Sequence, residues 1–368
     1  MSTYDKYAIP TEREVWSIPL AGDCRFTWEY EDGRDKLLAL YQKGKDKQWD
    51  AAKRIDWSLP IDPDKPLGLP PETAPIYGSR TFEKIKDDDK EMGRLARHLT
   101  AWQFSQFLHG EQGAMVCAAR IAEAVSDLDA KFYAATQVMD EARHAETYAR
   151  FLKDKVGLLY PINRHLKTLL AQTLSDARWD MPYLGMQVLI EGVALAAFGL
   201  LRDMTPEALP KQMLAYIMQD EARHVAFGRL ALRDYYRQLT RAELAEREEF
   251  VVEGCYLLRD RFTAEEVWRT LGYDVADCLE TVDRSPIMQA YRSLLFTRIV
   301  PCVKDIGLWG AKVQKAFADM GVTHLASTDL GELMKGDEDV AERIDEDKRQ
   351  LAARTAEVAA VIRLGAEA

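Results

Sequence analysis

Two copies of the pentapeptide Asp-Glu-Ala-Arg-His, at residues 140–144 and 220–224, carry the side chains of this sequence that are best suited to bind metal. A Glu and a His three positions apart on an α-helix project within about 60° of each other, so each Glu-x-x-His turns an oxygen and a nitrogen toward one point. Each pentapeptide also has a lone glutamate 30 residues before its own. The predicted metal ligands are Glu111, Glu141, His144, Glu191, Glu221 and His224.

These ligand types favour iron or manganese, because carboxylate oxygens with imidazole suit those metals, whereas zinc prefers fewer ligands in a closed site. Glu111 and Glu191 stand in apolar stretches, where an unpaired carboxylate is costly unless a cation accompanies it. Carboxylates can bridge two metals and change their binding mode as the metals change oxidation state. The pattern therefore predicts two iron ions, with a manganese–iron pair as the alternative, and O₂ as co-substrate.

A second set of charged residues lies inside the same pentapeptides. Asp140 and Asp220 each stand four residues before a predicted histidine ligand, and each is expected to accept the free ring N–H of a histidine, the one from the opposite half. Arg143 and Arg223 would neutralise these aspartates. The alternative interpretation is ordinary ion pairing along a helix.

Four helices are needed to position the six ligands. A four-helix bundle that holds two metals takes one Glu from each of two helices and one Glu-x-x-His from each of the other two, and this chain supplies that set once. Asp180, followed by Met181-Pro182, is expected to cap the third helix. The expected bundle helices cover residues 90–125, 129–156, 180–202 and 205–238, with a shorter helix at 163–175.

The residues before the predicted bundle differ from it in composition. Eight of the 14 prolines fall in the first 75 residues, which predicts an extended arm with one helix near 34–52. Because four tryptophans lie in this arm (Trp16, Trp28, Trp49 and Trp57), we expect it to pack on the bundle.

Beyond the bundle, residues 242–320 are predicted to form several helices, broken at Gly272, Pro286 and Pro301, and no strand-like alternation is present. The charged segment 337–364 is predicted to be a solvated surface helix, with a partner-docking tail as the alternative. The expected domains are an arm (1–85), a bundle (86–240) and additional helices (241–368).

Composition narrows the class of protein. A net charge of −11 over 368 residues argues against a nucleic-acid surface. We see no run of about 18 apolar residues, and the start of the chain is too polar for a signal peptide, so no membrane association is expected. The five scattered cysteines suggest reduced thiols in a cytoplasmic protein.

The ligand pattern resembles the ferritin-like di-iron carboxylate proteins, over roughly residues 100–230. It is similar to their oxygen-activating branch: the bacterial multicomponent monooxygenase hydroxylases, the small subunit of class I ribonucleotide reductase, the related ligand-binding oxidases, and p-aminobenzoate N-oxygenase. The resemblance implies an all-α fold, a ferritin-like four-helix bundle with additional helices and an extended N-terminal arm. It also implies that Glu111, Glu141 and His144 hold one metal, that the other three ligands hold the second, and that two of the glutamates bridge.

Tyr148 bears on the choice within this family. It lies four residues after His144, where the reductase subunit carries its radical tyrosine. It is therefore a candidate catalytic residue, although it could equally hydrogen-bond a ligand carboxylate or line the pocket. The reductase subunit also needs a tyrosine in its C-terminal tail, and the last tyrosine here is Tyr291, which counts against that function.

Three further positions depart from the patterns of named relatives. Ile217 stands where the N-oxygenase has an additional histidine ligand, so the sequence does not specifically favour arylamine N-oxygenation. Met186 and Gly113 stand where the ligand-binding oxidases join a tyrosine to a valine, so that crosslink cannot form.

Residues one or two helical turns from the ligands outline an apolar pocket. Gly113 and Gly192 adjoin ligand glutamates, and since glycine costs about 1 kcal/mol in a helix relative to alanine, we interpret them as room for O₂ or substrate. Gln137 and Gln187 are polar candidates near the metals. The expected pocket also includes Phe104, Phe107, Met115, Leu184, Val188, Ala194, Leu195, Phe198, Ile217 and Phe227.

The predicted function is that of a non-haem di-iron oxygenase that hydroxylates or N-oxygenates a small, largely apolar organic molecule. Such an enzyme needs electrons, which implies a reductase or ferredoxin partner, and a homodimer is compatible with the pattern. One alternative is a radical-generating or ligand-binding oxidase related to the reductase subunit. The other is a ferroxidase, whose chains are typically about half this length.

Overall fold

The computed structural model describes residues 2–11 and 15–366, with side chains as far as residue 357. Within these residues the chain is helical and forms no β-strand, and an isolated bridge joins Tyr7 of the arm to Leu159. The helices are η1 (Thr3–Lys6), α1 (Asp35–Asp46), α2 (Ala51–Arg54), η2 (Pro71–Thr73), α3 (Arg80–Ile85), α4 (Asp89–Ala124), α5 (Leu128–Phe151), η3 (Leu152–Val156), α6 (Arg164–Ser175), α7 (Asp180–Tyr183), η4 (Leu184–Ile190), α8 (Glu191–Met204), α9 (Ala208–Tyr236), α10 (Arg241–Asp260), η5 (Arg261–Thr263), α11 (Glu265–Leu271), α12 (Val275–Arg284), α13 (Pro286–Leu295), α14 (Ile299–Asp305), α15 (Ala311–Asp319), η6 (Thr323–Ser327) and α16 (Leu330–Ala366).

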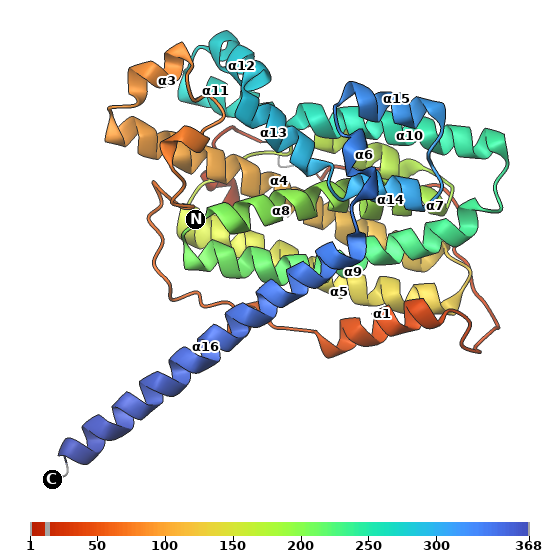
Figure 1. Ribbon diagram of the computed structural model, residues 1–368, viewed down its shortest axis with the longest axis horizontal. Helices are drawn as coiled ribbons and strands as arrows, with labels where there is room; N and C mark the ends of the chain where they lie inside the picture. The colour runs from red at the N-terminus through yellow and green to blue at the C-terminus, as the bar shows by residue number, and fades with distance from the viewer. Residues whose placement is uncertain (1, 12–14, 367–368) are drawn as a thin grey trace.

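The bundle consists of α4, α5, α8 and α9, which run along the length of the body in Figure 1. Helix α4 packs on α5 and α8 packs on α9. The carboxylate of Asp88 accepts hydrogen bonds from the first N–H groups of α4, and that of Asp127 caps α5 in the same way. These caps start the two helices within one or two residues of the predicted positions.

Two bundle helices contain π-helical turns that the sequence did not indicate. Helix α5 continues into η3 and ends at Gly157, whose φ of +71° suits glycine. The third bundle helix is α7, then the seven-residue π-helix η4, then α8. The expected N-cap at Asp180 is wrong, because Trp179 occupies that position and the Asp180 carboxylate instead pairs with Arg247 of α10 at 3.0 Å.

The N-terminal arm is less uniform than expected. The single helix predicted at residues 34–52 is broken into α1 and α2, and α1 lies along α5 and α9 (Figure 1). Trp49 and Trp57 are half-buried against the body, as expected. Trp16 and Trp28 are 42% and 85% exposed, so the earlier part of the arm does not bury its tryptophans.

The helical region after the bundle is interrupted at Gly272 and at Pro286, as predicted, whereas Pro301 lies inside a helix. Pro286 is the first residue of α13 and Pro301 lies in the first turn of α14, positions where the missing N–H has no helical partner to lose. Helix α16 begins earlier than predicted and is not wholly solvated. Its first part packs on α9, where Asp337 is buried and pairs with Arg298 at 2.6 Å, whereas its C-terminal part projects from the body (Figure 1).

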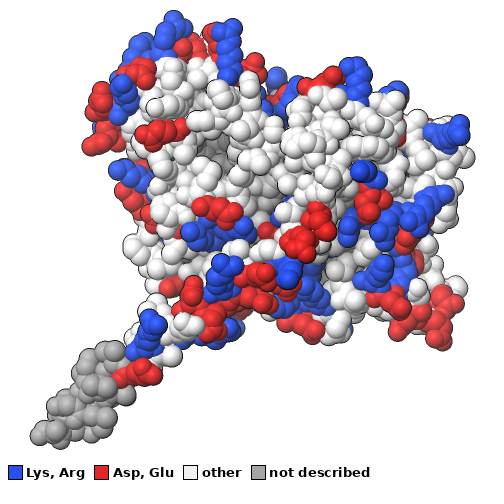
Figure 2. All heavy atoms as spheres, in the orientation of Figure 1, with Lys and Arg blue, Asp and Glu red and all other residues white. Residues whose placement is uncertain are grey.

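One stretch, Asp180–Met204, is long and apolar enough to cross a membrane by length and composition alone. Most of it is buried inside the bundle, as in the core helix of a soluble protein. On the face shown in Figure 2, acidic and basic side chains are intermixed, with no large patch of one sign.

Candidate metal centre

The six predicted ligands come together in the middle of the bundle, and all are buried. Their atoms form two overlapping groups, each within 4.8 Å: Glu111, Glu141, His144 and Glu221 in one, and Glu141, Glu191, Glu221 and His224 in the other. Glu141 and Glu221 belong to both groups, so these two carboxylates could be shared by two bound metals. The Nδ1 of His144 lies 2.9 Å from Glu221, and the Nδ1 of His224 lies 3.1 Å from Glu141.

The charges of this cluster require a cation. Burial, and next the charge of Glu221, raises the pKa of both Glu111 and Glu191 well above the usual value. Glu191 Oε2 has no hydrogen-bond partner among the described residues, and Glu141 Oε2, Glu221 Oε1 and His144 Nδ1 lie close together without forming a hydrogen bond of acceptable geometry. Buried polar atoms left without partners need another ligand. Oxygen and imidazole donors in these two groups fit a pair of iron or manganese ions.

The aspartate of each pentapeptide contacts the Nε2 atom of the histidine in the other pentapeptide. His144 Nε2 lies 3.1 Å from Asp220 Oδ2, and His224 Nε2 lies 3.2 Å from Asp140 Oδ2. Burial alone would raise the pKa of Asp220, but Arg223, His144 and Arg143 outweigh it and lower the pKa well below the usual value. Because an ionised aspartate accepts a hydrogen bond from the Nε2–H of the ring, the Nδ1 atom carries no proton and can bind a metal.

The arginines of the pentapeptides hold both aspartates. Arg143 donates to Asp140 and, at 2.8 Å, to Asp220. Arg223 donates to Asp220 and lies 3.7 Å from Asp140. The aspartates and arginines therefore form one buried network, which is more than ion pairing along a single helix.

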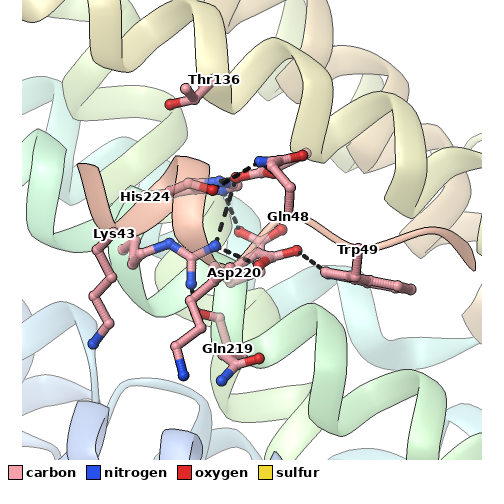
Figure 3. Close-up of polar contacts among 12 residues, drawn as sticks. Lys43, Gln48, Trp49, Thr136, Gln219, Asp220 and His224 are labelled. Atoms are coloured by element: carbon pink, nitrogen blue, oxygen red, sulfur yellow. Dashed lines mark hydrogen bonds and ion pairs between the residues drawn. The ribbon is translucent and has the colours of Figure 1, made fainter. Parts of the chain in front are cut away.

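Two residues of the arm complete this network and were not predicted to belong to the site. The Gln48 side chain donates to Asp140 at 2.7 Å and accepts from Arg143 at 2.7 Å. The Trp49 Nε1–H donates to Asp220 at 2.7 Å. Figure 3 shows both side chains reaching the cluster from the segment that follows α1. The only sequence indication was the number of tryptophans in the arm.

Gln137 lies within the cluster, where the sequence had suggested a polar side chain. Its Nε2 donates to Glu141 at 3.0 Å and to Glu191 at 2.9 Å, so one amide fixes carboxylates from two helices. Gln187 lies farther out and contacts Gln137 at 3.4 Å.

Tyr148 is fully buried, and its ring contacts Phe104, Phe107 and Phe198. Burial, followed by the charges of the ligand glutamates, raises the pKa of its hydroxyl well above the usual value. The hydroxyl has no hydrogen-bond partner among the described residues, so it does not hold a ligand carboxylate here.

A narrow cavity with a volume of about 30 Å³ lies beside the ligands. Glu111, Glu191 and Glu221 form part of its wall. Of the residues predicted to line a pocket, Phe107, Ala194 and Phe198 line this one. The others do not line it: Phe104, Gly113, Met115, Leu184, Gln187, Val188, Gly192, Leu195, Ile217 and Phe227.

Two physical reasons explain these differences. The π-helical turn η4 changes which side chains face inward, so Met186 and Ile190 line the cavity where α-helical spacing had indicated Val188. The glycines make room for other side chains, not for a small molecule. A Cβ on Gly113 would lie 2.5 Å from Leu170, and one on Gly192 would lie 2.9 Å from Ile299.

A helical bundle with four buried glutamates and two buried histidines in two overlapping groups defines the ferritin-like di-metal carboxylate proteins. Within that class, residues 31–307 match the model of the family described as p-aminobenzoate N-oxygenase AurF, and the chain belongs to this family. The protein is therefore an O₂-activating oxygenase whose buried carboxylates and imidazoles suit a di-metal centre.

Solved structures with a similar helical fold include variants of an R2-like ligand-binding oxidase with a manganese–iron cofactor. Two of these variants are 18% identical to this chain, with TM-scores of 0.47 and 0.46, and each match covers 76% of this chain and 100% of the other. This likeness is too distant to indicate a substrate. The search of curated proteins gave no match.

Proposed function

We propose that this enzyme oxygenates the nitrogen of a small aromatic amine, with two iron ions held by Glu111, Glu141, His144, Glu191, Glu221 and His224. The observation that carries this proposal is that three of these glutamates form part of the wall of the largely apolar cavity, so a substrate there would meet the metals directly. Membership of the N-oxygenase family supports nitrogen as the reacting atom. Ile217 in place of the additional histidine leaves a six-residue ligand set.

The irons would supply the reduction of O₂ and the transfer of one oxygen atom to the substrate. One turnover uses one O₂, two electrons and two protons, converts a primary amine to a hydroxylamine, and releases one water. The chain's own residues set the conditions for this reaction. Asp140 and Asp220 orient the histidine rings, Gln137 fixes two carboxylates, and Phe107 and Phe198 help to exclude water.

The test is anaerobic loading with ferrous iron, followed by O₂ and aniline as the probe amine. The wild-type protein is expected to bind two irons per chain and to form N-oxygenated product. Glu141→Ala, which removes a carboxylate common to both ligand groups, should lose most of its iron and its activity. The matched control is Glu146→Ala, an exposed glutamate on the same helix, which should change neither. A wild-type protein without iron, or a Glu141→Ala variant with full activity, would contradict the proposal.

The electrons must come from a partner, and we assign this role to a reductase or ferredoxin. All five cysteines are free and four are buried, which supports a reducing compartment and hence the cytoplasm. The exposed side chains of Phe26, Trp28 and Tyr30 on the arm support a homodimer, which sedimentation analysis would test.

We propose separate tasks for the three parts of the chain. Residues 1–85 complete the hydrogen bonding around the site through Gln48 and Trp49. Residues 86–240 hold the ligands. Residues 241–368 close the cavity with Arg261 and Phe262.

A further inference from the structure

A series of aromatic side chains begins at the metal site and leads away from it. Tyr133 of α5 lies beside the ligand His224, with 6.5 Å between the ring centroids. The ring of Phe227 contacts Tyr133 at a centroid distance of 4.3 Å, and it contacts Tyr183 of α7 at 5.1 Å. All of these rings are buried. A redox-active tyrosine therefore lies next to a predicted metal ligand, and a second tyrosine lies one ring farther out.

The series continues from Tyr183 to the surface. Trp179, which directly precedes α7, lies 5.7 Å from Tyr183, and Tyr235 of α9 lies 4.6 Å from Trp179. Trp179 and Tyr235 are only half-buried. Together with Tyr133 and Phe227, these three residues form an aromatic row that joins the metal site to the solvent.

Packing alone does not explain the inner tyrosines of the aromatic row. The hydroxyl groups of Tyr133 and Tyr183 are buried and have no hydrogen-bond partner among the described residues. A buried tyrosine usually has such a partner, and a hydroxyl buried without one lowers stability. Phenylalanine would fill the same space without that cost. The property that tyrosine has and phenylalanine lacks is ready one-electron oxidation, so we look for a redox role.

We propose that the aromatic row carries an electron from Tyr235 to the oxidised iron centre when no substrate is bound, which discharges the centre before it damages its own ligands. This role rests on the iron centre of the proposed function but not on the identity of the substrate. Resting ferric ions cannot draw an electron from tyrosine, because tyrosine oxidation needs a much stronger oxidant. The aromatic row therefore acts only after O₂ has reacted, and it does not replace the reductase.

The contacts of the aromatic row suit a transfer in several short steps. Electron tunnelling slows steeply with distance, so rings in contact transfer an electron faster than one long jump does. Phe227 is not oxidised itself, but its ring fills the gap between Tyr133 and Tyr183. Neither of these tyrosines can keep the radical, since its hydroxyl has no acceptor for the proton that it must lose. Tyr235 is half-buried, so its hydroxyl proton can leave to water.

The transfer balances in electrons and protons. One electron through the aromatic row and one proton from water pass to the oxidised iron centre. Tyr235 loses that electron and releases its hydroxyl proton to solvent, which leaves a neutral tyrosyl radical. A thiol from the medium then donates a hydrogen atom to the radical, and two of the resulting thiyl radicals combine to form a disulfide.

The experiment uses the full chain loaded with ferrous iron and mixed with O₂, without an amine or a thiol. Electron paramagnetic resonance of rapidly frozen samples detects radicals, and ring-deuterated tyrosine identifies a tyrosyl radical by its narrowed spectrum. Peptide mass spectrometry locates oxidised side chains after repeated exposure to O₂. We expect a tyrosyl radical in the wild type, with oxidation at Trp179 or Tyr235. Added thiol should remove both.

Tyr183→Phe interrupts the aromatic row and keeps its packing. This variant should lose most of the radical signal and most of the oxidation at Trp179 and Tyr235, with oxidation appearing instead beside the iron ligands. It should unfold at the same or a higher temperature than the wild type, because the removed hydroxyl has no partner. Tyr235→Phe is the second variant and should lose the tyrosyl radical. Tyr256→Phe, at a half-buried tyrosine of α10 outside the row, is the matched control and should behave as the wild type.

Three results would overturn the proposal. The first is oxidation of Trp28, which is 85% exposed, to the same extent as Trp179, because oxidants free in solution would cause it. The second is oxidation at Trp49 or Tyr216, whose rings also contact each other, with none in the aromatic row. The third is the wild-type pattern in Tyr183→Phe.

Iron content is measured on the same samples. Wild-type protein that binds two irons but shows no oxidation in the aromatic row would refute only the role of the row. Protein that binds no iron would refute the proposed function and this proposal together.

Discussion

A single oxygen, Asp220 Oδ2, accepts hydrogen bonds from three donors, one in the N-terminal arm and two in the first pentapeptide. Trp49 Nε1 lies 2.7 Å away, Arg143 2.8 Å and His144 Nε2 3.1 Å. The arm, one pentapeptide and the other pentapeptide therefore meet at one carboxylate. The orientation of the His144 ring depends on all of them.

We predict that Trp49→Phe weakens iron binding several-fold and lowers the free energy of unfolding by about 1 kcal/mol, because it keeps the aromatic packing but removes one hydrogen bond to a buried carboxylate. Competition with an iron chelator and urea unfolding would measure the two effects. Trp28→Phe is the control, since Trp28 lies on the same arm and is 85% exposed. Equal behaviour of the two variants would show that the hydrogen bond has no influence on the site.

Tyr148→Phe should be stable and active. The hydroxyl is buried without a partner, so its removal should leave the unfolding midpoint unchanged or raise it. O₂ consumption with an aromatic amine should stay within about threefold of the wild type if the tyrosine only packs against its aromatic neighbours. Complete loss of turnover, with iron content unchanged, would instead assign Tyr148 an essential redox role.

The residues of the metal cluster were predictable because their spacing follows helix geometry. Three other residues near the site could not be predicted: Gln48, Trp49 and Arg261. They approach the site from irregular segments whose path depends on tertiary packing. No local pattern in the sequence distinguishes Arg261 from a surface arginine. Only its burial without a partner does so.

At the scale of elements, the close approach of α4 and α6 depends on a glycine. A Cβ on Gly113 would lie 2.5 Å from Leu170 Cδ2. Gly113→Ala should therefore destabilise the fold by about 1–3 kcal/mol in urea unfolding. On the same helix, a Cβ on Gly110 would meet nothing within 4 Å, so Gly110→Ala should raise stability by up to about 1 kcal/mol. The two substitutions should change the free energy of unfolding in opposite directions, which separates the effect of packing from that of helix propensity.

The contact between α3 and α12 gives a pH dependence. Asp277 accepts hydrogen bonds from the N–H and hydroxyl of Thr81 and pairs with Arg80. Burial works in the opposite direction, yet these partners lower the pKa of Asp277 from 3.8 to about 2. The depressed pKa contributes stability that is present above pH 3.8 and is lost as the pH falls toward 2.

Asp277→Asn should lower stability at neutral pH by about 1–2 kcal/mol and flatten the acid part of the stability curve. Urea unfolding between pH 2 and pH 7 would measure this. The exposed Asp87→Asn variant should follow the wild-type curve. An Asp277→Asn curve parallel to that of the wild type would contradict the assignment.

The bundle helices were largely predictable from capping residues and apolar spacing, with boundaries correct to a few residues. The π-helical segment η4 could not be predicted, because its sequence, Leu-Gly-Met-Gln-Val-Leu-Ile, is equally suited to an α-helix. This segment packs against α9 and α10, contacts that the local sequence does not reveal. The pocket was consequently predicted less well than the ligands.

At the scale of the whole molecule, α16 is attached to the body by charge. Asp337 pairs with Arg298 of the connection before α14 and with Arg202 of α8, and all three are buried. Asp337→Asn should cost about 3–5 kcal/mol, since it leaves Arg298 buried without a counter-ion. Urea unfolding and the rate of proteolytic cleavage in α16 would detect the change. Asp339→Asn, at an exposed site two residues on, should alter neither.

The crossed hydrogen bonds of the two pentapeptides have a consequence for any attempt to simplify this protein. His144 is held by the aspartate of α9, and His224 by the aspartate of α5. A peptide of two helices cut from either half would carry a histidine whose ring has lost its anchor. Two such peptides would restore both contacts only by pairing, so that the aspartate of each peptide binds the histidine of the other. The smallest autonomous unit is thus a reciprocal pair, and the single chain is one way of keeping that pair permanently joined.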